Sequence, residues 1–126
     1  MLTLKVKSHS REELVEITDQ VAGKLTESGV ADGIVVLYVQ HTTAGLTVNE
    51  NADPDVPRDM LHALRTLIPQ HGMGFRHGEE NSDAHIKAAW LDLQSPFHLR
   101  MASFCWAAGR VSFCVSLTVV EKEKLS

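Results

Sequence analysis

Two short polar segments hold most of the side chains in this chain that could take part in chemistry. Residues 41–53 and residues 77–85 each gather imidazole, carboxylate, amide and hydroxyl groups. Both lie at the ends of strongly patterned hydrophobic segments, where a rigid element can hold reactive side chains at the edge of a cleft. We therefore predict that the two segments form the two halves of one active or ligand site.

Histidine is the feature that the two segments share. A neutral imidazole is the commonest transition-metal ligand, and it also transfers protons near neutral pH. His41 and His85 are the candidate catalytic histidines, and Glu50 is the best carboxylate for a general base or a metal ligand. Together with His77, the same two histidines would supply three ligands of an open zinc site, although their spacing matches no known zinc motif. Both roles remain open.

Several other polar residues are candidates for binding a substrate. Backbone amides at a helix start near residues 81–82 could bind a phosphate, with Lys87 adding positive charge. Helix capping explains Ser82 and Asp83 equally well, and strand propensity explains the threonines. Asp53 is more typical of a helix cap than of a catalyst. The candidate substrate-binding residues are Thr42, Thr43, Asn49, Asn81, Ser82, Asp83 and Lys87.

The composition indicates a single globular domain spanning residues 1–126. Hydrophobic residues make up 44% and charged residues 22% of the chain, which argues against disorder. The formal net charge is −4, and no dense stripe of Lys and Arg is present. Binding to nucleic acid or to an anionic membrane needs a concentrated positive field, so we expect neither. A small molecule is the expected partner.

The N-terminus does not resemble a secretory signal, and no segment is apolar for the roughly 20 residues that a membrane helix needs. We therefore expect a cytoplasmic location. Cys105 and Cys114 could face each other across a hairpin, but in this compartment we expect them to be reduced.

The hydrophobic periodicity predicts the elements that must position the two segments. Alternation predicts a strand over residues 2–6, and a nearly continuous apolar run predicts a buried central strand over residues 34–39. Helical spacing follows Ser10 as far as Gly29 and again follows Asp53-Pro54, where the helix should end near Pro69. A polar loop, residues 70–80, should lead to a third, short helix. The remaining predicted strands are residues 46–48, 97–106 and 111–120.

Residues 41–56, together with Asp59, closely resemble the signature of the YjbQ family, and residues 77–87 resemble its second motif. The clear resemblance covers about residues 30–91. It implies a compact α+β fold in which a mainly antiparallel sheet packs with two or three helices. It also implies a homotrimer with pockets near the subunit boundaries.

The family is also labelled secondary thiamine-phosphate synthase. The implied reaction condenses hydroxymethylpyrimidine pyrophosphate with thiazole phosphate and releases pyrophosphate, so the partner would be a small phosphorylated metabolite. Such a reaction needs charge stabilisation more than a nucleophile. The only fixed cations near the two segments are Lys87, Arg76 and Arg110, so a divalent metal, Mg or Zn, would supply much of the charge. The alternatives are a metal-dependent hydrolase, in which Glu50 activates water, and a noncatalytic module that binds a metabolite or a metal.

The C-terminal third departs from the family pattern. After a Gly-Arg pair that resembles Gly109-Arg110, family members usually continue to a Gly-Thr-Trp-Gln motif on the last strand, whereas this chain has Cys114-Val115-Ser116-Leu117. The usual Leu-Gly turn after the third helix is replaced by Leu91-Asp92. We expect these changes to alter one wall of the pocket.

Overall fold

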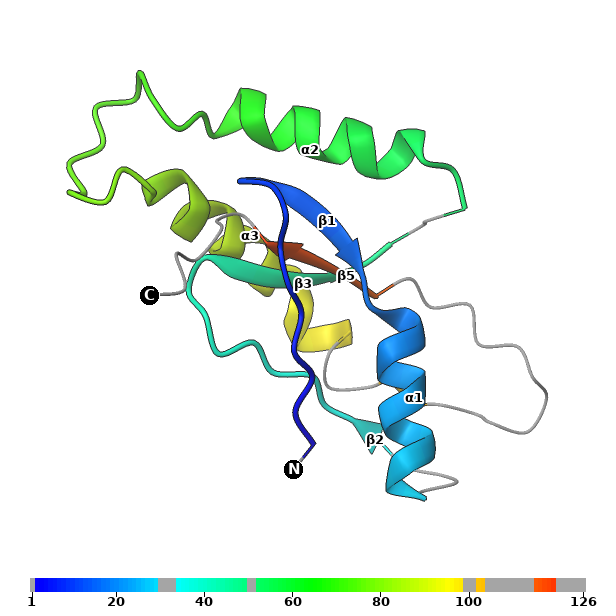
Figure 1. Ribbon diagram of the computed structural model, residues 1–126. Helices are drawn as coiled ribbons and strands as arrows, with labels where there is room; N and C mark the ends of the chain where they lie inside the picture. The colour runs from blue at the N-terminus through cyan, green and yellow to red at the C-terminus, as the bar shows by residue number, and fades with distance from the viewer. Residues whose placement is uncertain (1, 30–33, 50–51, 99–101, 104–114, 120–126) are drawn as a thin grey trace.

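The computed structural model describes residues 2–29, 34–49, 52–98, 102–103 and 115–119 (Figure 1). The predicted α+β fold is confirmed, because antiparallel strands pack with helices. In chain order, the elements are β1 (Glu13–Glu16), α1 (Thr18–Ser28), β2 (Ile34–Val35), β3 (Ala44–Val48), α2 (Asp55–Leu67), α3 (Ser82–His98), β4 (Ala102–Ser103) and β5 (Val115–Val119). Within these ranges, no helix is both long and apolar enough to cross a lipid bilayer.

The described strands form two antiparallel sheets. In the larger sheet the order is β1-β5-β3, so that β5, from the end of the chain, lies between two strands from its first half (Figure 1). The register places Leu117 opposite both Val15 and Leu46. In the smaller sheet β2 pairs with β4, and Ile34 lies opposite Ser103. The predicted strands at residues 97–106 and 111–120 therefore do not pair with each other in the described ranges.

Strand β3 is covered on both faces. Leu46 is buried in a cluster with Ile17 and Val21, which come from the start of α1. Gly45 lies on the opposite face of β3 from Leu46. It packs against α3, where a Cβ atom added to Gly45 would be 3.1 Å from the Leu91 Cβ atom. The strand is thus held between two layers of the molecule, and α3 crosses it in Figure 1.

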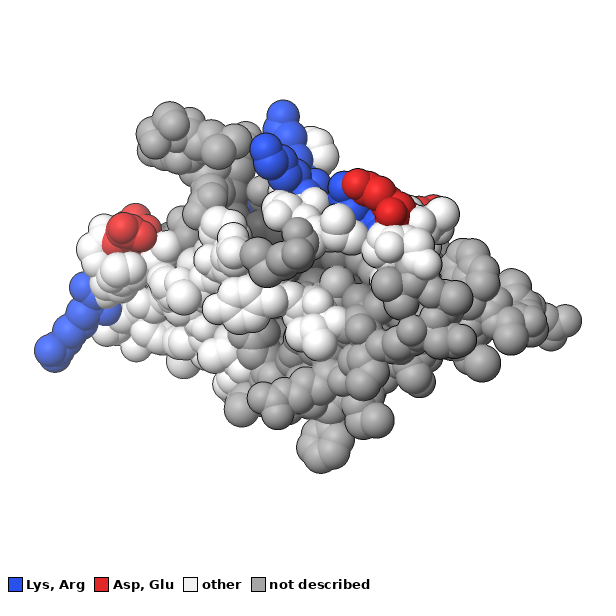
Figure 2. All heavy atoms as spheres, turned by 90° about the horizontal axis from the view of Figure 1, so that it is seen from below, with Lys and Arg blue, Asp and Glu red and all other residues white. Residues whose placement is uncertain are grey.

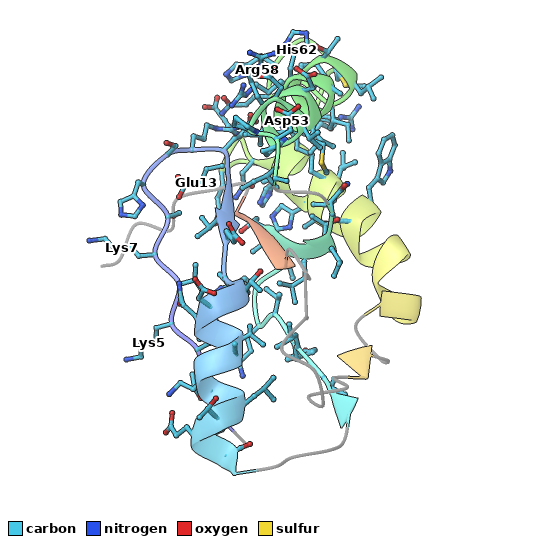
Figure 3. All side chains as sticks on the ribbon, turned by 90° about the vertical axis from the view of Figure 1, so that its right-hand side faces the viewer. Lys5, Lys7, Glu13, Asp53, Arg58 and His62 are labelled. Carbon is cyan, nitrogen blue, oxygen red and sulfur yellow. The ribbon has the colours of Figure 1, made fainter. Side chains whose placement is uncertain are left out.

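The N-terminal part of the prediction is partly wrong. Residues 2–9 form no strand, although Leu4 and Val6 do pack against the core. The intervening Lys5 and Lys7 project outward (Figure 3). The first helix begins at Thr18 and not after Ser10, because Glu13–Glu16 pair with β5 instead. Its predicted end is confirmed, since Gly29 caps it in the left-handed conformation with φ 71°.

The apolar run at residues 34–39 is not a buried central strand. Only Ile34 and Val35 form strand β2. The next residues alternate: Leu37 and Val39 pack against the core, whereas Val36 and Tyr38 are 66% and 83% exposed. A continuous apolar run indicated burial on both faces, but over residues 36–39 only alternate side chains meet the core.

Helices α2 and α3 mostly follow the prediction. The Asp53 Oδ1 atom accepts a hydrogen bond of 2.9 Å from the backbone N–H of Asp55, so its side chain binds the start of α2, but the N-cap position is Pro54 and the helix begins at Asp55, one residue later than predicted. Helix α2 ends at Leu67, before Pro69. In α3 the expected residues Ala84, Ala88 and Leu91 are buried, but the helix is longer than predicted and continues to His98. Residues 97–98 are therefore helical and do not begin a strand. The predictions for Glu50, Cys105, Gly109, Arg110 and Cys114 fall outside the described residues.

Figure 2 shows one face of the molecule, on which few of the described side chains are charged. On the face seen from below, the Lys, Arg, Asp and Glu side chains lie near the edge, and uncharged atoms occupy the rest of the described area (Figure 2). Among the described residues, ion pairs that include buried side chains occur only at the start of α3, where the second polar segment ends.

Candidate functional site

The first polar segment is divided by strand β3. His41 precedes the strand and Asn49 follows it, and a five-residue strand is about 13 Å long. Asn49 is exposed and its Nδ2 atom lies 3.4 Å from the Met60 Sδ atom of α2. His41 is exposed as well. The structure therefore does not bring the two ends of this segment together within one chain. Of the other predicted residues here, Thr42 is exposed, Thr43 is half-buried and Glu50 lies outside the described residues.

The second polar segment, residues 77–85, consists of the end of the loop at residues 70–80 and the start of α3. The Gln70 Nε2 atom donates a hydrogen bond of 3.0 Å to the Glu80 carbonyl oxygen and so joins the two ends of the loop. The Glu80 N–H in turn donates to the His77 carbonyl oxygen over 3.1 Å. Glu80 has φ 57°, a left-handed conformation that costs a non-glycine residue about 1–2 kcal/mol. Backbone strain of this kind is characteristic of functional loops.

The loop places the two histidines of the segment side by side. The ring centroids of His77 and His85 lie 5.5 Å apart, and the planes meet at 73° in an edge-to-face arrangement. His77 is exposed and His85 is half-buried. The Glu79 Oε2 atom lies 3.7 Å from the His77 Nε2 atom and accepts a hydrogen bond of 3.3 Å from the Asn81 Nδ2 atom. Two imidazoles beside a carboxylate can bind a polar ligand and move a proton to or from it.

The pair lies at the positive end of a helix. Asn81 is buried, and its carbonyl oxygen accepts hydrogen bonds from the N–H groups of Ala84 and His85, over 3.0 and 3.3 Å. The helix macrodipole adds partial positive charge at this end, which favours an anionic ligand. Ser82, the first residue of α3, is half-buried.

Asp83 and Lys87 are turned away from solvent into a network of ion pairs. Both side chains are essentially buried, and the Lys87 Nζ atom lies 2.9 Å from Asp83 Oδ2 and 2.6 Å from Glu12 Oε1. The Arg11 guanidinium donates two hydrogen bonds, of 2.9 and 3.1 Å, to the two carboxylate oxygens of Asp83. Arg65, in the last turn of α2, reaches the other Glu12 oxygen, with 2.5 Å between Nε and Oε2. The positive charge of Lys87 is thus paired internally and is not directed at a ligand.

The network lowers the pKa of both of its carboxyl groups. Burial alone would raise the pKa of Glu12, but hydrogen bonds from Lys87 and Arg65, with their positive charges, outweigh burial and hold the pKa below the usual 4.5. Burial likewise opposes ionisation of Asp83, and the hydrogen bonds and charges of Arg11 and Lys87 hold its pKa below the usual 3.8. Both carboxylates are therefore ionised at neutral pH and bound to cations.

The predicted metal ligands do not converge in the described part of the chain. No three His, Cys, Asp or Glu side chains come together there as a metal ion would require. His77 and His85 are neighbours, but His41 does not complete a three-ligand set with them. The described side chains of one chain therefore do not form the expected three-histidine metal site, and we derive no chemical step through a metal.

Three residues of the network escaped the sequence analysis. Arg11 and Glu12 lie 72 and 75 positions from their partners on α3, so no local pattern connects them. The one available signal was the spacing of Asp83 and Lys87, which are four residues apart and so lie on one helical face. Such a pair of opposite charges indicates an internal ion pair as readily as a ligand site. Arg65 carried no comparable signal.

The chain matches the model of a known protein family. Residues 2–102 match the model of the family described as "UPF0047 protein YjbQ-like". The match is wider than the resemblance to residues 30–91 and includes the N-terminal segment and β1. It ends before β5.

Individual relatives agree with this result. The chain is 53% identical to the UPF0047 protein MJ1081 of Methanocaldococcus jannaschii over 85 residues, which is 68% of this chain and 61% of the relative. It is 44% identical to the UPF0047 protein YugU of Bacillus subtilis over 87 residues, 69% of this chain and 66% of the relative. The matched region thus spans slightly less than two thirds of these relatives.

Solved structures show the same fold. A protein of the YjbQ/UPF0047 family from Clostridium acetobutylicum, described as uncharacterised, superposes with a TM-score of 0.74 and 33% identity, covering 92% of this chain and 87% of that one. A conserved hypothetical protein from Thermus thermophilus gives a TM-score of 0.71 and 35% identity, covering 91% and 86%.

Proposed function

Since the chain belongs to the UPF0047 family of YjbQ-like proteins, whose members named above carry no stated activity, we propose a function from the site itself. The protein binds a small phosphorylated metabolite at the corner formed by the loop at residues 70–80 and the start of α3. There it acts as a transferase of the thiamine-phosphate synthase type. The observation that carries the proposal is the His77–His85 pair, held 5.5 Å apart at the positive end of a helix.

The chemistry of the reaction is compatible with this corner. Displacement of pyrophosphate requires donors and positive charge where negative charge develops on the leaving group. The helix start and the two imidazoles supply donors, and His85 is the candidate acid or base. Arg76 is exposed, adjoins His77, and forms no ion pair with any described residue. Lys87 is neutralised by its partners, so Arg76 is the better source of fixed charge.

Asp83 and Lys87, first expected to touch the substrate, act in this proposal by fixing the helix. Asn81 and Ser82 lie at the helix start and remain the proposed contacts of the phosphate group. The first segment extends beyond both ends of β3. Its predicted site residues are His41, Thr42, Thr43, Asn49 and Glu50. If both segments serve one site, a second copy of the chain must supply part of it. We therefore retain the homotrimer as a proposal, together with a cytoplasmic location and a divalent metal bound between copies.

The direct test is to measure the formation of thiamine phosphate from hydroxymethylpyrimidine pyrophosphate and thiazole phosphate. Wild type should form the product, and replacement of His85 by Ala should lower kcat by a factor of about 10² to 10⁴, as expected for loss of a general acid or base. His77→Ala should also lower the rate. The matched control is His62→Ala, because His62 is exposed on α2 (Figure 3). This variant should keep full activity.

Other outcomes would assign the site differently. Equal activity in wild type and in the folded His85→Ala variant would remove the His pair from the mechanism. Calorimetric binding of pyrophosphate without turnover would favour the noncatalytic module. Hydrolysis of a phosphate ester, together with zinc at stoichiometric amount by elemental analysis, would favour the metal-dependent hydrolase.

A further inference from the structure

The ion-pair network joins the segment before β1 and helix α2 to the first turns of α3. Arg11 and Glu12 immediately precede β1, Arg65 lies in the last turn of α2, and Asp83 and Lys87 lie in α3. Replacing a buried ion pair by well-packed apolar residues is often neutral for stability or better. The main effect of such a network is then to fix geometry. In this protein the network fixes the position of the first turns of α3, which carry His85.

The contact between Arg11 and Asp83 is the most restrictive part of the network. Two parallel hydrogen bonds, of 2.9 and 3.1 Å, join the guanidinium to both carboxylate oxygens. A bidentate contact of this kind sets both distance and orientation, because the two planar groups must face each other. One turn further along α3, the Lys87 Nζ atom donates a hydrogen bond of 2.6 Å to the Glu12 Oε1 atom, so the segment before β1 contacts the helix at two points. The helix is therefore held against rotation as well as against sliding.

His85 lies between these two anchored residues on the helix. Successive residues turn by about 100°, so His85 lies about 200° around the helix from Asp83 and from Lys87. The anchored face is buried, and His85 is half-buried on the other side, against the His77 ring. Any rotation of the first turns of α3 would thus move one ring of the pair away from the other.

We propose that Arg11 is a positioning residue of the His77–His85 site and that it acts through Asp83. In this role Arg11 acts on Asp83 and not on the ligand. It holds Asp83, Asp83 sets the rotation of α3, and that rotation keeps His85 at the distance and angle seen against His77. The inference rests on the proposed function only in treating the His pair as the reactive part of the site.

The test compares two arginine variants by NMR in the absence of substrate. Arg11→Met removes the bidentate contact. The matched control is Arg58→Met, because the ion pairs of Arg58 with Asp55 and Asp59 are exposed on α2 (Figure 3). Arg11→Met should lose the nuclear Overhauser effect between the two imidazole rings. Hydrogen exchange at the amides of Ala84 and His85 should become about tenfold faster, as expected when a charge-assisted hydrogen bond is lost.

Two further readouts separate positioning from general destabilisation. The amide of Val21, which bonds to the Ile17 carbonyl oxygen at 2.9 Å in α1, should exchange as in wild type. With substrate, kcat of Arg11→Met should fall while KM changes little. If Arg11→Met does not fold, Arg11→Lys decides, because lysine keeps the charge but not the two-pronged contact. It should show a partial loss of the ring contact.

An unchanged ring contact and unchanged exchange at His85 in a folded Arg11 variant would overturn the positioning role, whatever the activity. The reverse result is equally distinct. Loss of the ring contact in a protein whose wild type forms no thiamine phosphate would uphold the positioning role and reject only the proposed function.

Discussion

At the scale of single residues, Gly45 is the position where the core leaves no space for a side chain. A Cβ atom there would lie 3.1 Å from the Leu91 Cβ atom and 3.3 Å from the Ala88 carbonyl oxygen, both on α3. These neighbours are a helix backbone atom and the root of a side chain, so neither can move aside independently of the helix. The close approach of α3 to β3 therefore depends on glycine.

We expect Gly45→Ala to lower the free energy of unfolding by about 1–3 kcal/mol, as overpacking does. Gly23→Ala is the matched control, because Gly23 lies in α1 with no atom within 4 Å of the added Cβ. That change should raise stability by about 0.5–1 kcal/mol, since alanine favours the helix. Urea unfolding of the two variants checks the sign. Equal stability of the Gly45 variant and wild type would contradict the packing.

At the scale of elements, the sequence predicted what local spacing determines. The end of α1 at Gly29, a strand at residues 46–48, which the structure extends back to Ala44, and the buried residues of α3 follow from periodicity and caps. The start of α1 did not, because Leu14 and Ile17 fit a helix as well as a strand, and β1 exists through its pairing with β5 about a hundred residues later. Local patterns carry no information on such partners.

The same limit applies to the candidate site. The neighbourhood of His77 and His85 was predictable, since both belong to one segment that a loop and a helix start keep together. The contacts of Asp83 and Lys87 were not, because their partners Arg11 and Glu12 were expected inside a helix. Pairing across that distance in sequence is decided by tertiary packing alone.

The anchoring of α3 makes stability depend on pH in a defined direction. Glu12 and Asp83 have pKa values lowered in the folded protein, so they add stability above their ordinary values of 4.5 and 3.8. That contribution is lost as pH falls through the lower folded values, where the unfolded chain binds protons first. Stability measured by denaturant unfolding should therefore fall on acidification below about pH 4.5.

Replacing one of the two carboxylates identifies the source of the acid dependence. Asp83→Asn should flatten this part of the pH profile, although it also lowers stability at pH 7 by removing the carboxylate that Arg11 and the buried Lys87 share with each other. Glu27→Gln is the control, since Glu27 forms an exposed pair with Lys24. A surface pair contributes little, so the control should follow wild type. A profile that is as steep in Asp83→Asn as in wild type would exclude this carboxylate as the cause.

At the scale of the whole molecule, the division of the first polar segment by β3 has a consequence for assembly. His41 and Asn49 lie beyond opposite ends of the strand, too far apart for one small ligand to contact both. In the proposed homotrimer, His41 of one copy and Asn49 of another can meet at a subunit boundary. Native mass spectrometry should then give three times the chain mass of 13.9 kDa.

Complementation tests whether the site is shared between copies. Trimers assembled from His41→Ala chains and Asn49→Ala chains should regain activity that neither variant has alone, because some boundaries would contain both wild-type residues. A mixture of His41→Ala and His41→Gln chains is the control and should stay inactive. Mixed trimers that form but remain inactive would place the whole site within one chain.

The burial of Lys87 also provides a natural reporter of motion. Its side chain is 1% exposed, so an acylating reagent in water can reach the amine only after α3 has separated from the segment before β1. Lys5 and Lys7 carry the same amine outward (Figure 3) and react without any opening. Under native conditions, the delay of acylation at Lys87 relative to these two lysines therefore measures how rarely the anchored helix detaches.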